Sequence, residues 1–269
     1  MVINIDPILL QLGPLAIRWY GLMYVVGFLA GLAVCIPYAK SRGLTEDDVW
    51  AVFWPAVVLG LLGARLYYVA QQDLGPYLAQ PWRILATWEG GMAFYGAIFG
   101  AVLALLIVAR QRKISFWRLL DAGAFFAVVG QAFGRVGNIV NGDVVGYPTD
   151  LPWGFIYVHA NSFVPEKGVA YPPAAVYELI FNILMFVFLW KVKDRLRAPG
   201  TLFATWLVTY SVGQILIFTQ RMNDVVFMGL KQAQVTALVV IVLCIPLMWY
   251  LQGRESTPAG RGEDTEEAF

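Results

Sequence analysis

Long runs of apolar residues, separated by short polar segments, dominate the chain. Because a helix needs roughly 20 apolar residues to cross a bilayer, such runs predict membrane-spanning helices. The fourth run carries Asp121 and Gln131 and the sixth carries Gln214, so these two are the least apolar. The pattern predicts an all-α polytopic membrane protein with about seven transmembrane helices. The expected spans are Ile17–Tyr38, Trp50–Ala70, Met92–Ala109, Leu119–Val136, Pro173–Trp190, Leu202–Gln220 and Ala233–Leu251.

Two segments between the expected spans are longer than the rest. Residues 71–90 contain prolines and two Trp residues, a composition typical of an interfacial segment with aromatic anchors. Residues 137–172 form the longest polar stretch and are expected to fold as a small extracytoplasmic cap. Residues 1–252 are therefore predicted to form one integral membrane domain. Residues 253–269 are polar and acidic at their end, and are predicted to be a disordered cytoplasmic tail.

The basic residues of the connecting segments predict the orientation. The segments after the first, third and fifth spans, together with the tail, hold 12 Lys and Arg residues, against 4 in the segments after the second, fourth and sixth spans. Lys and Arg accumulate on the cytoplasmic side of membrane proteins. The N-terminus is therefore expected outside and the C-terminus inside.

Composition excludes several other classes of protein. Hydrophobic residues make up 59% of the chain and charged residues 14%, whereas a soluble domain has about 45–50% and about 25%. The formal net charge of +1 argues against a nucleic-acid partner. His159 is the one histidine, and Cys35 and Cys244 lie in separate apolar runs. Neither a multi-histidine metal site nor a cysteine metal site is expected, and no cofactor is implied.

In the predicted orientation, the polar side chains of the spans gather near the outer ends of the helices. A pore would distribute such groups through the whole depth of the membrane, whereas a one-sided cluster suits a site that acts on a lipid headgroup. Charges inside a bilayer are costly and are therefore functional candidates. The group includes Tyr20, Arg65, Tyr95, Arg135, Glu178 and Arg221.

Structural interpretations compete with the functional ones. Arg221 could extend to the interface as an ordinary helix-end arginine, and Arg65 could be a buried ion-pair partner. Glu178 could be a helix-start charge that complements the helix dipole. The pairs Gly27/Gly31, Gly96/Gly100 and Gly130/Gly134 are typical of close-packed helix faces.

Arg135 has the strongest functional signal. Gly134 and Gly137 flank it, and glycine allows the backbone to approach a ligand closely. Arginine offers a planar fork of donors that suits a phosphate group. Asn138 and Asn141 would add neutral donors on one side if the helix continues that far, and an acidic residue follows at position 143.

This segment resembles a family signature. The run from Gly134 to Gly146 is similar to the pattern G-R-x-G-N-F-x-N-x-E-x-x-G of the prolipoprotein diacylglyceryl transferase family, with Ile139 for the Phe and Asp143 for the Glu. Other family elements occur in order along the chain: W-Y-G-L-M-Y, G-x-R-x-x-Y, G-G-M-x-F and P-x-Q-x-Y-E resemble residues 19–24, 63–68, 90–94 and 173–178.

Some positions depart from the family pattern. Tyr95 stands where the family has a histidine, and Pro172 stands where it has the histidine of H-P. On the sixth span, the positions aligned with a family Arg and Glu hold Gln214 and Phe218, while Arg221 matches a further Arg.

The resemblance implies an enzyme of the bacterial cytoplasmic membrane. It would transfer the diacylglyceryl group of phosphatidylglycerol to the thiol of the lipobox cysteine in a prolipoprotein signal peptide, releasing glycerol phosphate. The expected partners are phosphatidylglycerol, lipobox signal peptides and membrane lipids, and the protein is expected to act as a monomer.

The resemblance also implies roles for single residues. Arg135 would bind and stabilise the leaving phosphate, Asn138 and Asn141 would orient the headgroup, and Asp143 would position Arg135 or a headgroup hydroxyl. Tyr95 would orient the thiol or relay its proton, although a phenol with a pKa near 10 is a poor general base. The remaining residues expected to bind the phospholipid are Tyr20, Arg65, Gly137, Gly146 and Arg221.

Two other functions remain open at this point. A lipid-binding or scaffold relative with altered catalysis is favoured by Tyr95, Gln214 and Phe218. A transporter is disfavoured by the clustering of polar groups on one side and by the lack of an internal repeat.

Overall fold

The computed structural model describes residues 1–13 and 15–256. It separates into two compact units. The described residues of unit 1 are 1–13, 15–35 and 121–256, and those of unit 2 are 36–120. Most of the predicted tail, residues 257–269, lies outside the described residues.

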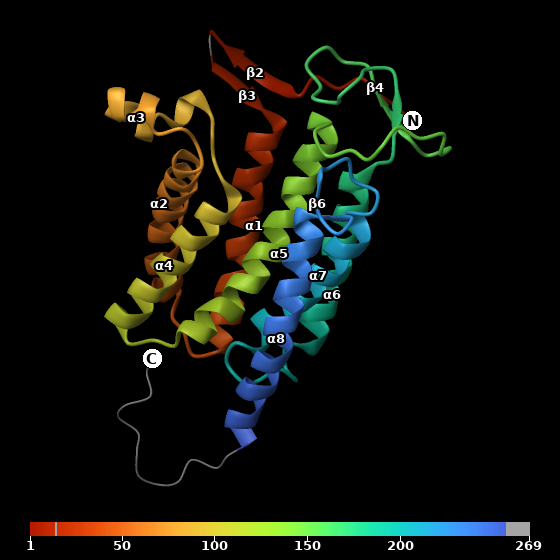
Figure 1. The fold of residues 1–269 in the computed structure, drawn as a ribbon. Helices are drawn as coiled ribbons and strands as arrows, with labels where there is room; N and C mark the ends of the chain where they lie inside the picture. Colours follow the sequence, from red (N-terminus) through yellow and green to blue (C-terminus); the bar gives the residue numbers. More distant parts are fainter. Residues whose placement is uncertain (14, 257–269) are drawn as a thin grey trace. The chain divides into compact units, whose positions relative to one another are not determined.

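The chain is built mainly from long helices, as predicted (Figure 1). Within the described residues, six are long and apolar enough to cross a membrane. The helix over the sixth expected span is shorter, at 17 residues, or about 26 Å at 1.5 Å per residue. The prediction of an all-α polytopic membrane protein is confirmed. The helices are α1 (Trp19–Ser41), α2 (Glu46–Ala70), α4 (Phe94–Arg112), α5 (Phe116–Asn141), α6 (Ala174–Val192), α7 (Thr201–Ile217) and α8 (Gln232–Ser256).

Unit 2 is centred on the pair α2 and α4. Gly63 of α2 and Gly96 of α4 lie so close that a Cβ on either would collide with the backbone of the other helix. Gly100 has the same relation to Leu59, which confirms the predicted close-packed face of Gly96/Gly100. Between the two helices the chain forms three short helical segments, α3 (Gly75–Ala79), η1 (Pro81–Leu85) and η2 (Thr87–Glu89).

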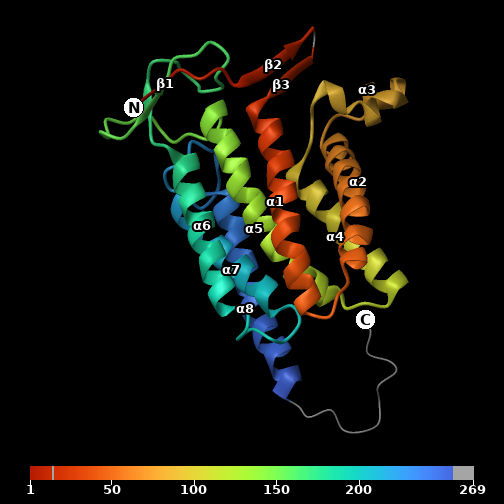
Figure 2. The same cartoon turned by 180° about the vertical axis from the view of Figure 1, so that it is seen from behind.

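Unit 1 contains α5 to α8 and most of α1, and α5 to α8 lie beside one another in both views (Figures 1 and 2). A Cβ at Gly27 or Gly31 of α1 would press against α5, at Phe133 and Phe126 respectively. This confirms a close-packed face for that pair. The expectation for Gly130/Gly134 was wrong, because an added Cβ at either glycine would meet no described atom of unit 1 within 4 Å.

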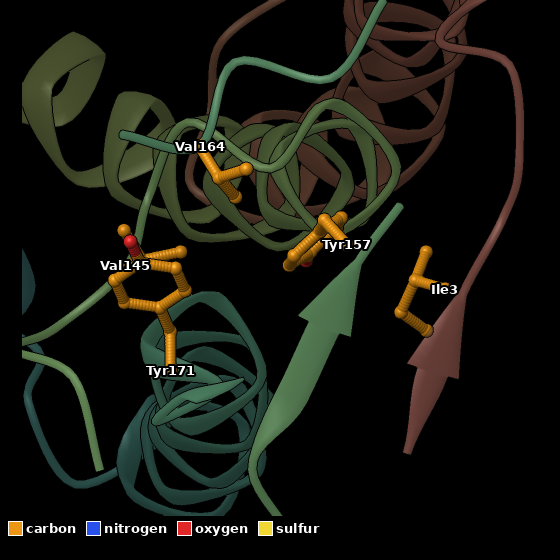
Figure 3. Close-up of a cluster of buried hydrophobic side chains, with 5 residues drawn as sticks. All are labelled: Ile3, Val145, Tyr157, Val164 and Tyr171. Atoms are coloured by element: carbon orange, nitrogen blue, oxygen red, sulfur yellow. The ribbon is translucent and has the colours of Figure 1, made fainter. Parts of the chain in front are cut away.

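Short strands cover one end of the unit 1 helices. The strand β1 (Val2–Ile3) runs parallel to β4 (Phe155–Tyr157), which pairs antiparallel with β5 (Ala170–Tyr171). Figure 3 shows the buried side chains that pack around this sheet: Ile3, Val145, Tyr157, Val164 and Tyr171. Two antiparallel hairpins complete the unit, β2 (Ile8–Leu12) with β3 (Leu15–Arg18), and β6 (Val225–Phe227) with β7 (Leu230–Lys231).

Helix α5 continues five residues past the predicted end of its span, to Asn141. The amide of Gly142 then donates to the carbonyl of Asn138 at 2.8 Å, and Gly142 has φ +74°. Glycine adopts this left-handed conformation at a helix end without steric cost. The extension carries Asn138 and Asn141 on the helix itself, so both lie on the same side of α5 as Arg135.

Asp121, the carboxylate within the fourth expected span, has a structural role. Its Oδ2 accepts from the amide of Gly200 at 2.7 Å and its Oδ1 from the amide of Phe203 at 2.8 Å. These amides belong to the start of α7, where backbone N–H groups lack partners within the helix. The buried carboxylate therefore fixes the beginning of α7 against α5.

Candidate functional site

Two arginines share one buried carboxylate in unit 1. The Nη2 of Arg135 on α5 lies 2.5 Å from Oε2 of Glu178 on α6. The Nη1 of Arg221, in the segment after α7, lies 3.1 Å from Oε1 of the same residue. Glu178 is only 1% exposed. Two guanidinium groups therefore compensate the hydration that a carboxylate loses at this depth.

Glu178 is the main feature that the sequence reasoning missed. It was interpreted as a charge at a helix start, and it does lie in the first turns of α6. The available signal was its position inside an apolar run, where a charged group usually has a partner of opposite sign. Arg221, for which the sequence also allows an ordinary place at the membrane interface, is one of these partners.

Backbone contacts hold Arg221 in place. Arg221 forms an isolated antiparallel bridge with Gly146, and the amide of Met222 donates to the carbonyl of Val145 at 3.4 Å. A Cβ at Gly146 would collide with the carbonyl of Gln220. Glycine at position 146 thus allows the segment that carries Arg221 to lie directly against the cap.

Lys231 holds the segment that carries Arg221 through two hydrogen bonds to backbone carbonyls. Its Nζ donates to the carbonyl of Phe218 at 2.7 Å and to the carbonyl of Arg221. Burial lowers the pKa of the Arg221 guanidinium, and the neighbouring Glu178 carboxylate opposes this shift. Arginine remains charged at neutral pH in spite of such a shift.

A chain of amide hydrogen bonds extends from Arg135 to Asp143. Nη1 of Arg135 donates to Oδ1 of Asn138 at 2.9 Å, and Nδ2 of Asn138 donates to Oδ1 of Asp143 at 2.9 Å. Nδ2 of Asn141 donates to the other carboxylate oxygen at 3.0 Å. Asp143 is thus joined to Arg135 through Asn138. Burial and the Asp143 carboxylate raise the pKa of Tyr157 to about 12.

Several polar atoms of this cluster are buried and have no hydrogen-bond partner among the described residues. They are Nε of Arg135, Nε of Arg221 and Oδ1 of Asn141. Two are donors on cationic groups and one is an acceptor. Such a set can bind an anion next to a hydroxyl group, because charge-assisted donors suit phosphate oxygens and an amide oxygen accepts from O–H.

Charges in the cluster do not cancel. Arg135, Arg221 and Lys231 are cationic, while Glu178 and Asp143 are anionic at neutral pH, so one positive charge remains uncompensated. The arginine side chains are 21% and 16% exposed. A site of this kind attracts an anionic ligand and remains accessible to it.

Tyr20 lies beside the same turn of α5. A Cβ at Gly137 would meet the Cα and ring of Tyr20 at 3.0 Å, so glycine here permits close contact between α1 and α5. The hydroxyl of Tyr20 shares a hydrogen bond of 2.7 Å with the hydroxyl of Tyr24. The structure therefore brings together Tyr20, Arg135, Gly137, Asn138, Asn141, Asp143, Gly146 and Arg221 in unit 1.

Arg65 and Tyr95 belong to unit 2. Arg65 is 2% exposed and donates from Nε to the carbonyl of Ile84 at 2.9 Å and from Nη2 to the carbonyl of Arg83 at 2.6 Å. Its Nη1 donates to the carbonyls of Gly90 and Gly91, at 2.5 and 3.1 Å. Its partners are backbone carbonyls rather than a carboxylate, and they hold residues 83–91 against α2.

Tyr95 is in the first turn of α4 and is half-buried. Its ring lies 6.0 Å from that of Phe94. The next residue, Gly96, packs against Gly63 of α2, so the backbone that carries the phenol is tightly held.

Comparison with known proteins decides the family. A family model of prolipoprotein diacylglyceryl transferases matches residues 7–250. The chain belongs to this family. A protein of Geobacter sulfurreducens named phosphatidylglycerol–prolipoprotein diacylglyceryl transferase is 40% identical over 224 residues, which cover 82% of this chain and 84% of the relative. Proteins of the same name from Cupriavidus metallidurans and Trichormus variabilis are 34% and 35% identical and cover 95% and 97% of this chain, with 97% and 95% of the relatives covered.

As a prolipoprotein diacylglyceryl transferase family member with several membrane-competent helices, the chain is a multi-pass membrane protein. One departure from the family pattern now has a structural description. Phe218, at the position aligned with a family Glu, places its ring 4.7 Å from the guanidinium of Arg221. A cation–π contact therefore stands where the resemblance predicts a carboxylate. The other departure on this helix, Gln214, is 7% exposed.

Proposed function

We propose that this protein transfers the diacylglyceryl group of phosphatidylglycerol to the lipobox cysteine thiol of prolipoproteins in the bacterial inner membrane. One observation carries the proposal beyond family membership. Arg135 and Arg221 converge on Glu178 and still retain buried, unpartnered Nε donors. Such a set of donors suits an anionic ligand, and the relatives are named for an anionic phospholipid, phosphatidylglycerol.

The reaction requires a displacement at carbon. The cysteine thiolate attacks the glycerol carbon that bears the phosphate, a C–S bond forms, and the C–O bond to phosphate breaks. The electron pair of that bond leaves with the phosphate, which becomes glycerol phosphate, and the thiol proton is released. Negative charge grows on the leaving oxygen, so fixed donors that point at it lower the barrier.

The residues of unit 1 fit distinct parts of this step. Two of the five N–H bonds of Arg135 are used by Glu178 and Asn138, so three remain for the phosphate. Arg221 supplies a second cationic donor. Oδ1 of Asn141 can accept from a hydroxyl of the headgroup glycerol. Asp143 acts on Arg135 through Asn138, since it holds the amide whose oxygen accepts from the guanidinium.

Most of the other expected lipid-site residues support this arrangement. Tyr20 of α1 lies against Gly137 of α5 at one side of the cluster. Gly146 leaves room for the backbone of the segment that carries Arg221. Although the sequence predicts Arg65 in the lipid site, four of its N–H bonds already donate to backbone carbonyls, and we propose that it stabilises residues 83–91 instead. Tyr95 remains the proposed group for the thiol proton, and no metal or organic cofactor enters the proposal.

We further propose that the N-terminus and the cap lie outside the cytoplasmic membrane and that the C-terminus lies inside. The distribution of basic residues supports this orientation. Single cysteines at Lys167 in the cap and at Thr257 would be introduced after removal of Cys35 and Cys244. An impermeant thiol reagent should label position 167 in intact cells and position 257 only after lysis; the reverse pattern would contradict the orientation.

The deciding experiment is incubation of the purified protein with phosphatidylglycerol and a lipobox peptide. A thioether product with one equivalent of glycerol phosphate is expected. Bound phosphatidylglycerol without product would instead support the second candidate, a lipid-binding relative, which Tyr95, Gln214 and Phe218 favour. An enzyme with an established activity on the same peptide would serve as the positive control.

A further inference from the structure

Two side-chain amides lie one helical turn from the Arg135–Glu178 ion pair, on the faces of α5 and α6 that meet. Gln131 precedes Arg135 by four residues, and Asn182 follows Glu178 by four residues. Residues four apart share a helix face and are separated by about 6 Å along the axis. Both amides are therefore displaced from the ion pair toward the middle of their helices.

The contacts between α5 and α6 place these amides between two fixed points. At one end, Arg135 pairs with Glu178. At the other, the ring of Phe125 lies 6.0 Å from the ring of Phe186 and 5.6 Å from that of Trp190. The helices are thus antiparallel and face each other along this length. Gln131 and Asn182 lie between the two contact points, on opposite helices.

The side-chain oxygens of both amides lack a hydrogen-bond partner among the described residues. Oε1 of Gln131 and Oδ1 of Asn182 are both buried, and Asn182 as a whole is only 3% exposed. A buried polar group without a partner costs free energy of about 1–3 kcal/mol. Two such groups on facing helices indicate that something other than this chain completes them.

The sequence of layers identifies the missing partner. The first layer, Arg135 with Glu178, is charged, and the second, Gln131 with Asn182, is polar and neutral. The third layer is apolar and buried, and comprises Val128 on α5 and Met185 on α6, with Phe125 and Leu189 beyond them. A phospholipid has the same order: a charged phosphate, then the two neutral ester groups of its glycerol, then acyl chains.

We propose that Gln131 and Asn182 bind the ester carbonyls of the phospholipid donor. A half-turn about the last side-chain bond exchanges the amide oxygen and nitrogen, so the NH2 group can occupy the unpartnered position and donate to a carbonyl. This proposal rests on the proposed function. It adds a specificity determinant for a diester lipid to the site that binds the phosphate.

Chemistry provides a test that leaves the reacting bonds unchanged. Dialkyl ether phosphatidylglycerol has the same headgroup, glycerol carbon and leaving phosphate as the diester, but it lacks both ester carbonyls. The parent protein should use the diester at least about fivefold more efficiently in kcat/KM, since one hydrogen bond between neutral groups contributes roughly that factor. Equal use of the two lipids by an active parent protein would overturn the inference and leave the proposed function intact.

Variants assign the preference to the two amides. Gln131→Met and Asn182→Leu remove the amides at similar volume, and each should reduce use of the diester while leaving use of the diether unchanged. Leu184→Met, on the exposed side of α6, is the control and should keep the parent's preference. A variant that lowers use of both lipids in the same proportion would assign the amide a purely structural role and overturn the inference.

A binding measurement tests the inference even if the protein does not turn over. Competition between the diester and the diether for the purified parent protein, followed by native mass spectrometry, does not depend on turnover. The diester should win in the parent and in Leu184→Met, its advantage should shrink in Asn182→Leu, and the two lipids should bind equally in the double variant Gln131→Met/Asn182→Leu. If Asn182→Leu does not fold, Asn182→Ala replaces it. Failure to form thioether would count against the proposed function, whereas equal binding by the parent would count against the amides.

Discussion

Two arginines, one buried in unit 2 and one half-buried in unit 1, illustrate different uses of the same side chain. Arg65 in unit 2 donates to four backbone carbonyls and holds residues 83–91 on α2. Arg135 in unit 1 contacts side chains, Glu178 and Asn138, and keeps a buried donor without a partner. An arginine whose donors are already occupied stabilises a fold, whereas one with unoccupied donors beside a second cation can bind a ligand.

The largest effect is expected at Arg135. Arg135→Lys keeps the charge but loses the planar fork, so turnover should fall about a hundredfold, which corresponds to roughly 3 kcal/mol of transition-state stabilisation. Thioether formation and thermal unfolding would be measured together. Arg112→Lys, which alters an ion pair with Asp48 in unit 2, should leave turnover unchanged. Near-normal turnover by Arg135→Lys would remove the arginine fork from the mechanism.

The second effect, expected at Tyr95, tests whether unit 2 contributes to chemistry at all. Tyr95→Phe removes only the hydroxyl and should reduce turnover about tenfold or more, as loss of a proton-transfer group does. Tyr95→His should retain or raise activity near neutral pH, because imidazole accepts a proton in that range. Rates would be recorded between about pH 6 and pH 9, with Tyr67→Phe of α2 as the control. If Phe matches the parent throughout, the hydroxyl has no role.

The smallest effect on turnover is expected at Arg65. Arg65→Lys cannot reproduce the four hydrogen bonds, so the free energy of unfolding should fall by about 2–3 kcal/mol. Amide hydrogen exchange should accelerate within residues 83–91, and turnover of the folded fraction should change by less than about threefold. A hundredfold loss of turnover with unchanged exchange would make Arg65 a ligand-binding residue and end the contrast with Arg135.

Some parts of this site could be predicted from the sequence because they depend on spacing along one helix. Arg135, Asn138 and Asn141 are three apart in succession, so their common side follows as soon as the helix continues. The pairing of Glu178 with Arg135 and Arg221 could not be predicted in this way. It joins segments about 40 residues apart, and charge alone does not determine which partner a carboxylate meets.

The role of Arg65 could not be predicted from the sequence for a different reason. Its acceptors are main-chain carbonyls, which every residue possesses, so no residue type marks the segment that it binds. Gly134 shows the opposite error. Its spacing from Gly130 is typical of helix packing, yet an added Cβ at either glycine would meet no described atom of unit 1 within 4 Å, whereas one at Gly137 would meet Tyr20 of α1.

The parallel pairing of β1 with β4 constrains the order in which the protein can assemble. Val2 pairs with Ile156 and Ile3 with Tyr157, so the first strand finds its partner only after some 150 further residues have been synthesised. At about 5–20 residues per second, that is a wait of roughly 8–30 s. During this interval the edge of β1 lacks the hydrogen bonds that β4 later provides. The β1–β4 pairing is therefore a long-range contact that forms late in folding. It can form only once α5 and the segment after it are in position.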